Sequence, residues 1–273
     1  MIYMGLVWPL TDRMYHLFQR LGWTALNYKQ EVVVQGFGLN LFMHYALFIG
    51  IMLTLHFLVA PLPMFTLETI SLFAMMLFSL TSLGWIDDRW GDPEVKGFKG
   101  HFGKLVAEKH MTSGLAKAVF GLLVALVVCW QLSSSYGEFM LFSLALVLSM
   151  HIFNLLDVRP GRALKSYWLF SLAVIPFVSA ATLLFLTLPV LCSTVLLFGY
   201  DRRRMAMLGD TGSMALGGIF GFQLIVHAPL ILVAMFVIFF MILTIAAERI
   251  SISAWIEQHR WLKLMDGWGL VKK

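Results

Sequence analysis

Four aspartates stand where apolar stretches end or begin. Asp87 and Asp88 follow an apolar stretch in "SLGWIDDRWGD", and Asp157 follows another in "HIFNLLDVRPGR". Asp210 precedes an apolar stretch in "LGDTGSMALGG". A helix C-terminus already carries about half a negative charge, so the first three carboxylates are disfavoured unless a cation neutralises them. Mg²⁺ suits such a site because it takes oxygen ligands, retains water and is completed by substrate phosphates. Asn154 shares a helix face with Asp157 and could orient that carboxylate or a substrate.

Asp210 has a second explanation that the residues alone favour. An aspartate at a helix start is a preferred N-cap, whose side-chain oxygen accepts hydrogen bonds from the first-turn N–H groups. Ser213, Gly217 and Gly221 then follow at four-residue spacing. Such a stripe of small residues lets two membrane helices approach closely, and this structural role is sufficient for the glycines.

Basic side chains accompany the carboxylates. Pyrophosphate chemistry needs both, because the metal neutralises bridging oxygens and the cations hold the charge on the leaving phosphate. The alternative is that these cations offset a negative helix end or only follow the positive-inside rule. The candidates near the aspartates are Lys96, Lys99, Lys117, Arg159 and Arg162.

The elements that must position these side chains are membrane helices. Hydrophobic residues make up 60% of the 273 residues and charged residues 13%, against roughly 25% charged in soluble domains. A span needs about 20 apolar residues, and such stretches predict spans at 37–60, 64–86, 114–132, 138–156, 166–181, 183–200, 212–226 and 229–247. The predicted fold is therefore an all-α, polytopic membrane helix bundle of about 8–10 transmembrane helices with a cytoplasmic catalytic cleft.

The remaining segments complete the predicted organisation. Residues 1–10 are apolar but too short to cross, so 1–36 is expected to be an N-terminal interfacial or cytoplasmic segment. Residues 37–247 form the transmembrane domain and 248–273 a cytoplasmic tail.

The cations predict the orientation. All 20 Lys and Arg lie in segments 1–36, 87–113, 157–165, 201–211 and 248–273, or early in an adjoining helix. Because cytoplasmic loops collect Lys and Arg, these segments face the cytoplasm, as in a multi-pass protein of the bacterial cytoplasmic membrane. The net charge of +5 then reflects topology, and no nucleic acid is expected as a partner. Cys129 and Cys192 lie within spans and are expected to be packing residues.

Taken in order, these motifs resemble a known family. Asp87-Asp88, Asn154 with Asp157, and the run Gly209 to Ser213 are similar to motifs of the polyprenyl-phosphate N-acetylhexosamine-1-phosphate transferases, across roughly residues 35–258. The resemblance implies a helix bundle with a groove for the lipid carrier. It also implies Mg²⁺-dependent transfer of a sugar-1-phosphate from a UDP-sugar to undecaprenyl phosphate, with release of UMP, in cell-envelope polysaccharide or peptidoglycan precursor synthesis.

The resemblance also implies roles for individual residues. Asp87 and Asp88 would handle the lipid phosphate and the metal, and Asp210 would bind the metal while capping its helix. Lys96 and Lys117 would lie near the diphosphate. With Asp157, these aspartates are the candidate catalytic residues, and the candidate substrate-binding residues are Asn154, Lys96, Lys99, Lys117, Arg159 and Arg162.

The chain departs from the family pattern in four places. Pro160 stands where the family has an aspartate three residues after Asp157, and "NYKQEVVVQGFGL" replaces an early "PTMGG"-type segment. A histidine cluster expected near the C-terminus is absent from the sequence, and the N-terminal helix is cut short. These departures leave two alternatives open. Either the donor differs from the usual UDP-N-acetyl sugars, or the chain is a catalytically degenerate relative that binds the lipid carrier or scaffolds an envelope-assembly complex. A transporter would instead place ionisable residues at mid-membrane and show an internal repeat; a homodimer is left open.

Overall fold

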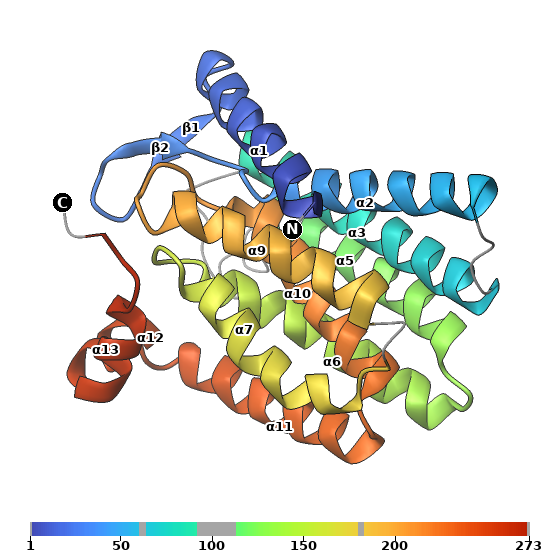
Figure 1. Ribbon diagram of the computed structural model, residues 1–273. Helices are drawn as coiled ribbons and strands as arrows, with labels where there is room; N and C mark the ends of the chain where they lie inside the picture. The colour runs from blue at the N-terminus through green and yellow to red at the C-terminus, as the bar shows by residue number, and fades with distance from the viewer. Residues whose placement is uncertain (1, 60–63, 92–112, 180–182, 272–273) are drawn as a thin grey trace.

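The computed structural model describes residues 2–59, 64–91, 113–179 and 183–271, and most of them form helices that run alongside one another (Figure 1). This confirms the predicted all-α helix bundle. The helices are α1 (Ile2–Arg20), α2 (Leu39–Leu58), α3 (Met64–Trp90), α5 (Ser113–Leu132), α6 (Tyr136–Leu156), α7 (Arg162–Val174), α9 (Leu188–Asp201), α10 (Gly209–His227), α11 (Leu230–Ala247), α12 (Ile252–Gln258) and α13 (Arg260–Gly267). A 3₁₀ turn, η1 (Ile175–Phe177), extends α7, and a π turn, η2 (Leu183–Thr187), precedes α9.

Within the described ranges, six helical stretches are long and apolar enough to cross a membrane. They are α2, Leu67–Trp90 of α3, α5, α6, Leu183–Asp201 and α11. The predicted spans 166–181 and 212–226 correspond to α7 and α10, which are not among the six. α7 has only 13 residues, and α10 is rich in glycine and polar side chains in place of long apolar ones.

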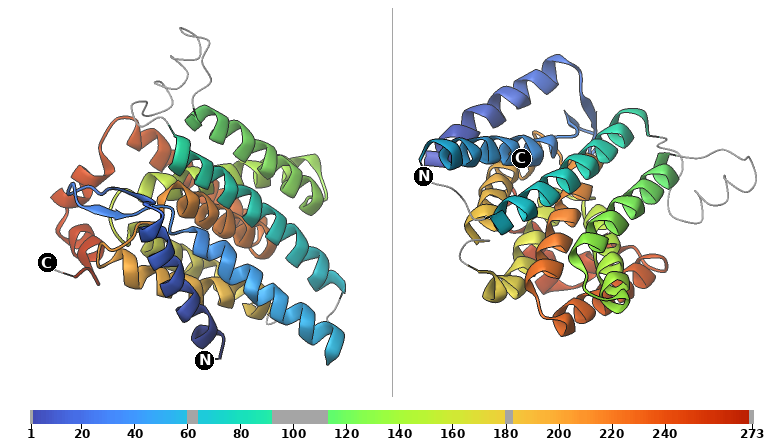
Figure 2. Two further views of the ribbon diagram at one scale, coloured as in Figure 1. Left: turned by 90° about the horizontal axis from the view of Figure 1, so that it is seen from above. Right: turned by 90° about the vertical axis from the view of Figure 1, so that its right-hand side faces the viewer.

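α10 is the centre of the bundle, between α3 and α6. Every residue from Thr211 to Ile225 is buried. In Figure 2 other helices surround α10, which is drawn in orange. A Cβ added to Gly217 would meet the backbone of Met150, and one added to Gly221 would meet Leu146. The predicted stripe of small residues is confirmed, because it lets the backbones of α10 and α6 approach closely.

A β-hairpin that the sequence did not predict lies between α1 and α2. Strands β1 (Thr24–Leu26) and β2 (Val32–Val34) pair antiparallel. Val34 also exchanges backbone hydrogen bonds with the segment before α10, donating to Met205 at 3.2 Å and accepting from Met207 at 2.8 Å. The hairpin thereby ties the segment "NYKQEVVVQGFGL" to the start of α10.

The N-terminal segment is one helix from Ile2 to Arg20, longer than the short apolar stretch expected at 1–10. It packs on the bundle through α2 and α9. The Thr11 hydroxyl lies 2.9 Å from His44 Nε2, and the Tyr3 hydroxyl donates to the His44 carbonyl at 2.8 Å. The expected interfacial or cytoplasmic segment is therefore packed against the membrane helices over much of its length.

Candidate functional site

Asp88, in the last turn of α3, caps the N-terminus of α10. Its Oδ1 accepts the Asp210 N–H at 3.0 Å, and its Oδ2 accepts the Thr211 N–H at 2.9 Å and the Thr211 hydroxyl at 2.5 Å. Gln35 Nε2, just after β2, donates to Oδ1 at 2.9 Å. Four donors match the roughly four lone-pair sites of a carboxylate. Asp88 is therefore fully engaged in holding α10 to α3, and its charge meets the positive end of the helix.

The prediction that Asp210 caps its own helix is wrong. The N-cap is Leu208, which forms no side-chain cap, and Asp210 lies within the first turn. Gly209 has φ +70°, and a Cβ there would fall 2.9 Å from the Asp88 Cγ. The Asp88 carboxylate thus occupies the capping position from outside, which leaves the Asp210 side chain free for another partner.

That partner is Lys117, on α5. Its Nζ lies 2.6 Å from Asp87 Oδ2 and 3.0 Å from Asp210 Oδ2, so α3, α5 and α10 meet at one ammonium. The three side chains are only 11–29% exposed, which strengthens their mutual attraction relative to water. Burial raises the pKa of Asp210 to about 7; the Lys117 charge opposes this rise, and Asp87 and Asp88 add to it.

Asp157 and Asp201 extend the acidic cluster. Asp157 is the C-cap of α6 and accepts a hydrogen bond from the Gly209 N–H. Burial raises its pKa well above the usual value, and the nearby charges of Asp201, Asp210 and Asp88 raise it further. Asp201, at the end of α9, accepts the Gly161 N–H at 2.7 Å. The four predicted aspartates therefore meet where α3, α6 and α10 come together.

The described residues contain no group of three or more His, Cys, Asp or Glu side chains arranged to hold a metal ion. Asp87 and Asp210 nevertheless direct oxygens at the same cation, the Lys117 ammonium. Mg²⁺ is commonly held by one or two carboxylates, with water and substrate phosphates as its other ligands. The two carboxylates fit such an ion, whereas the hydrogen bonds of Asp88 leave it no free acceptor site.

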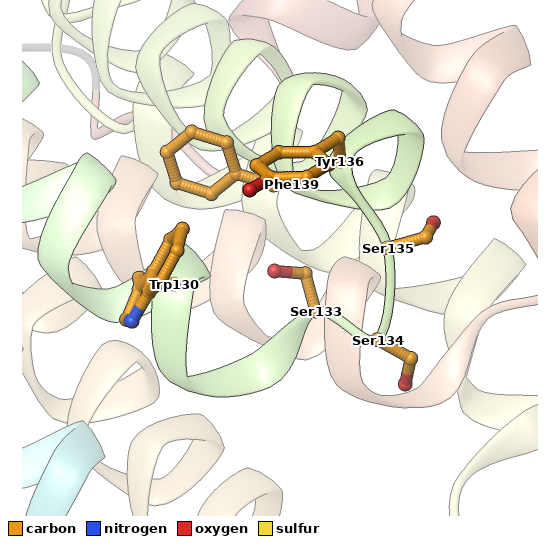
Figure 3. A pocket seen from close by; sticks show the side chains of 6 residues that line it. All are labelled: Trp130, Ser133, Ser134, Ser135, Tyr136 and Phe139. Atoms are coloured by element: carbon orange, nitrogen blue, oxygen red, sulfur yellow. The ribbon is translucent and has the colours of Figure 1, made fainter.

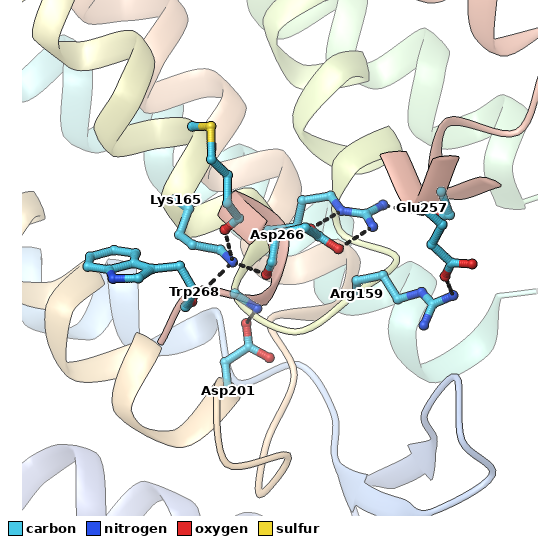
Figure 4. A network of polar contacts seen from close by, with 10 residues as sticks. Arg159, Lys165, Asp201, Glu257, Asp266 and Trp268 are labelled. Atoms are coloured by element: carbon cyan, nitrogen blue, oxygen red, sulfur yellow. Dashed lines mark hydrogen bonds and ion pairs between the residues drawn. The ribbon is translucent and has the colours of Figure 1, made fainter. Parts of the chain in front are cut away.

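Three basic residues, one in the turn before α7 and two in its first turn, bind the C-terminal segment (Figure 4). Arg162 donates to both oxygens of Asp266 at 2.8 and 2.9 Å. Lys165 Nζ donates to the carbonyls of Met265, Asp266 and Trp268. Arg159 Nη2 lies 3.0 Å from Glu257 Oε1, and its guanidinium stacks 4.3 Å from the Tyr28 ring centre. Arg159 and Arg162 thus contact α12, α13 and the hairpin, and not the cluster of Asp87, Asp88, Asp157 and Asp210.

The other predicted residues have varied positions. Asn154 is half-buried in the last turn of α6, and its carbonyl accepts the Asp157 N–H at 3.2 Å. Lys96 and Lys99 fall in 92–112, outside the described residues. Their proximity to the aspartates stays a prediction.

A small hollow of about 210 Å³ lies at the turn between α5 and α6 (Figure 3). Its lining residues are Trp130, Ser133, Ser134, Ser135, Tyr136 and Phe139. Trp130 is thirteen residues after Lys117 on the same helix, a rise of roughly 20 Å. The hollow is therefore at the far end of α5 and belongs to no part of the acidic cluster.

Comparison with protein-family models found no match for this chain, and comparison with curated proteins found none either.

Sequence reasoning missed two residues of the cluster. Asp201 directly follows a predicted span on the expected cytoplasmic side, as Asp87 and Asp157 do, but three arginines follow it and could neutralise it locally. Gln35 carried no comparable signal, because its contact with Asp88 spans 53 residues of sequence.

Proposed function

We propose that this protein transfers a sugar-1-phosphate from a UDP-sugar to a polyprenyl phosphate such as undecaprenyl phosphate, with Mg²⁺, at the cytoplasmic face of a bacterial membrane. The observation that carries the proposal is the meeting of Asp87 and Asp210 at the Lys117 ammonium. Two carboxylates and a lysine at one point can serve a metal-bound diphosphate, and the order of the aspartate motifs resembles that of the transferase family.

The proposed reaction forms a bond between a phosphate oxygen of the lipid carrier and the β-phosphorus of the donor. The bond between that phosphorus and the bridging oxygen breaks, and UMP leaves with the oxygen. The lipid phosphate needs little help from a base, because its second pKa is near 6. Mg²⁺, held by Asp87 and Asp210, would neutralise charge on the diphosphate oxygens.

The chain's own groups then have distinct tasks. Lys117 lies between the two carboxylates and can donate to a phosphate oxygen once a metal takes its place there. Asp88 positions α10, and with it Asp210, through the backbone N–H groups it accepts. Asp157 binds the Gly209 N–H and so fixes the turn that leads into the same helix.

The experiment is donor-dependent release of UMP. Membranes containing the protein receive undecaprenyl phosphate, Mg²⁺ and one of a panel of UDP-sugars, including UDP-N-acetylglucosamine and UDP-N-acetylmuramoyl-pentapeptide. At least one donor should yield UMP, and Asp210→Asn should abolish the release. Glu68→Gln is the matched control, since Glu68 is an exposed carboxylate at the other end of α3. A panel without any UMP release would refute the transferase.

A non-catalytic carrier-binding protein is the second candidate. It is favoured by the engagement of Arg159 and Arg162 with the C-terminal segment, which occupies two groups predicted to hold phosphates. Binding of undecaprenyl phosphate without UMP release from any donor would support it. Mg²⁺-dependent UDP binding that Asp210→Asn removes would argue for the enzyme.

A further inference from the structure

The C-terminal helix α13 exposes an apolar face. Trp261 is 79% exposed, Leu264 58% and Met265 56%, and Trp268 directly after the helix is 65% exposed. At about 100° per residue these positions share one stripe of the helix surface. A tryptophan-rich stripe of this kind is costly in water and typical of the membrane–water boundary.

The polar side of α13 faces the protein. Asp266, about opposite the stripe, is half-buried and forms the bidentate pair with Arg162, a side chain only 6% exposed. Lys165 holds the end of the helix through three carbonyls. The Asp266 carboxylate of α13 therefore points toward Arg162 (Figure 4), whereas Trp261 and Trp268 are exposed. A helix packed for aqueous surroundings has the reverse orientation.

The location of α13 points to lipid as the medium it meets. The apolar span α11 ends at Ala247, and α12 begins at Ile252, so the segment starts within a few residues of the membrane boundary. Figure 1 shows α12 and α13 beside that end of α11. Arg260 and Lys263 are both exposed on α13; Arg260 lies beside the apolar stripe and Lys263 lies on the opposite, polar face. Cations beside an apolar helix face and on the polar face of the same helix match a bilayer surface with anionic headgroups.

We propose that α13 lies in the cytoplasmic boundary of an anionic bilayer, with Trp261, Leu264 and Trp268 among the headgroups and upper acyl chains. The partner is the lipid surface rather than a protein. The expected cytoplasmic tail is then an interfacial anchor, tied to the bundle through Arg162 and Asp266. This inference is independent of the proposed transferase activity.

The test measures the depth of a spin label on full-length protein in vesicles of phosphatidylcholine and phosphatidylglycerol. The label is attached at Leu264→Cys, in a background in which Cys129 and Cys192 are replaced by alanine and the protein elutes as one species. Gln258→Cys, at the exposed end of α12, is the matched control. Collisions with oxygen report lipid, and collisions with a water-soluble nickel chelate report water.

At residue 264 the ratio of oxygen to nickel collisions should exceed that at 258 severalfold, and it should fall when phosphatidylcholine alone forms the vesicles. Equal ratios at the two sites would place α13 in water and overturn the proposal. Shielding of residue 264 from both reagents, or dipolar broadening between labels, would identify a protein or a second copy as the partner and overturn it as well. A ratio unaffected by lipid charge would overturn the role of Arg260 and Lys263.

Discussion

Replacement of Asp88 by alanine should destabilise the whole bundle. The substitution removes the acceptor of the Asp210 N–H, the Thr211 N–H and hydroxyl, and the Gln35 amide. It also removes the negative charge that faces the start of α10. The contacts of α10 with α3 and with α6 are more extensive than those between any other two elements. Loosening the first turn of α10 therefore affects the centre of the fold.

The expected loss follows from the groups left without a partner. An unsatisfied buried donor costs about 1–3 kcal/mol, and partial access of water to the Asp210 side chain, 29% exposed, moderates the sum. We expect a loss of about 3–5 kcal/mol in the free energy of unfolding. At about 2–4 °C per kcal/mol, the midpoint should fall by about 6–20 °C. Asp88→Asn keeps one acceptor oxygen and should lose about half as much.

The assay is thermal unfolding of purified protein in detergent with a thiol-reactive dye, at one fixed heating rate. Cys192 is only partly buried, so all proteins in this assay carry Cys192→Ala. Labelling of Cys129, which is fully buried in α5, then reports opening of the bundle. Glu68→Ala is the control on the same helix and should change the stability by no more than about 0.5 kcal/mol. If Asp88→Ala unfolds within about 1 °C of the parent protein, capping of α10 by Asp88 does not stabilise the fold and the reasoning is refuted.

Three further outcomes are expected. Asp210→Asn should leave the thermal midpoint unchanged or raise it, since burial and neighbouring carboxylates already disfavour the charge of Asp210. The variant should also lose any rise in the midpoint that MgCl₂ causes in the parent protein. A fall in the midpoint as large as that of Asp88→Ala would show that Asp210 stabilises the fold. Arg162→Met should release the C-terminal segment, seen as faster trypsin cleavage there. Burial alone would raise the pKa of Asp266, but the hydrogen bonds and charge of Arg162 outweigh burial, so the pKa lies below its usual value. The contact therefore contributes fully at neutral pH and is lost as the pH falls below about 4. A C-terminal segment that is equally protected in both proteins, or that is unaffected by acid, would contradict this. Gly38→Ala should destabilise severely in the thermal assay because its Cβ would overlap the Gly212 backbone, whereas Gly50→Ala, with nothing within 4 Å, should be neutral or slightly stabilising; equal effects would contradict the close approach of α2 and α10.

Much of the architecture could be predicted from local sequence. Apolar runs about 20 residues long specify helices because a membrane interior forces backbone groups to pair within the segment. The distribution of Lys and Arg then predicts which helix ends share a side. That was enough to expect that Asp87, Asp157 and Asp210 would lie at the same end, and the four-residue spacing of Gly217 and Gly221 was enough to expect close packing.

The division of tasks among the aspartates could not be predicted in this way. Asp87 and Asp88 are adjacent in the sequence, yet on a helix their side chains point about 100° apart. One therefore meets Lys117 and the other meets the start of α10. The role of Arg162 was equally hidden, because its partner Asp266 lies 104 residues away. Short strands such as β2 depend on contacts of the same long range.

The arrangement of charges argues for a ligand beyond the protein. Asp88 is satisfied by hydrogen bonds, which a fold requires of any buried carboxylate. Asp87 and Asp210 are different, because they share one ammonium and lie near further carboxylates that raise the pKa of Asp210. A buried ion pair can often be replaced by apolar residues without loss of stability, so folding alone does not require two acids around Lys117. Ionisable groups with perturbed pKa values cluster at functional sites. A divalent cation with a phosphate-bearing substrate would relieve the repulsion between Asp210 and the neighbouring carboxylates.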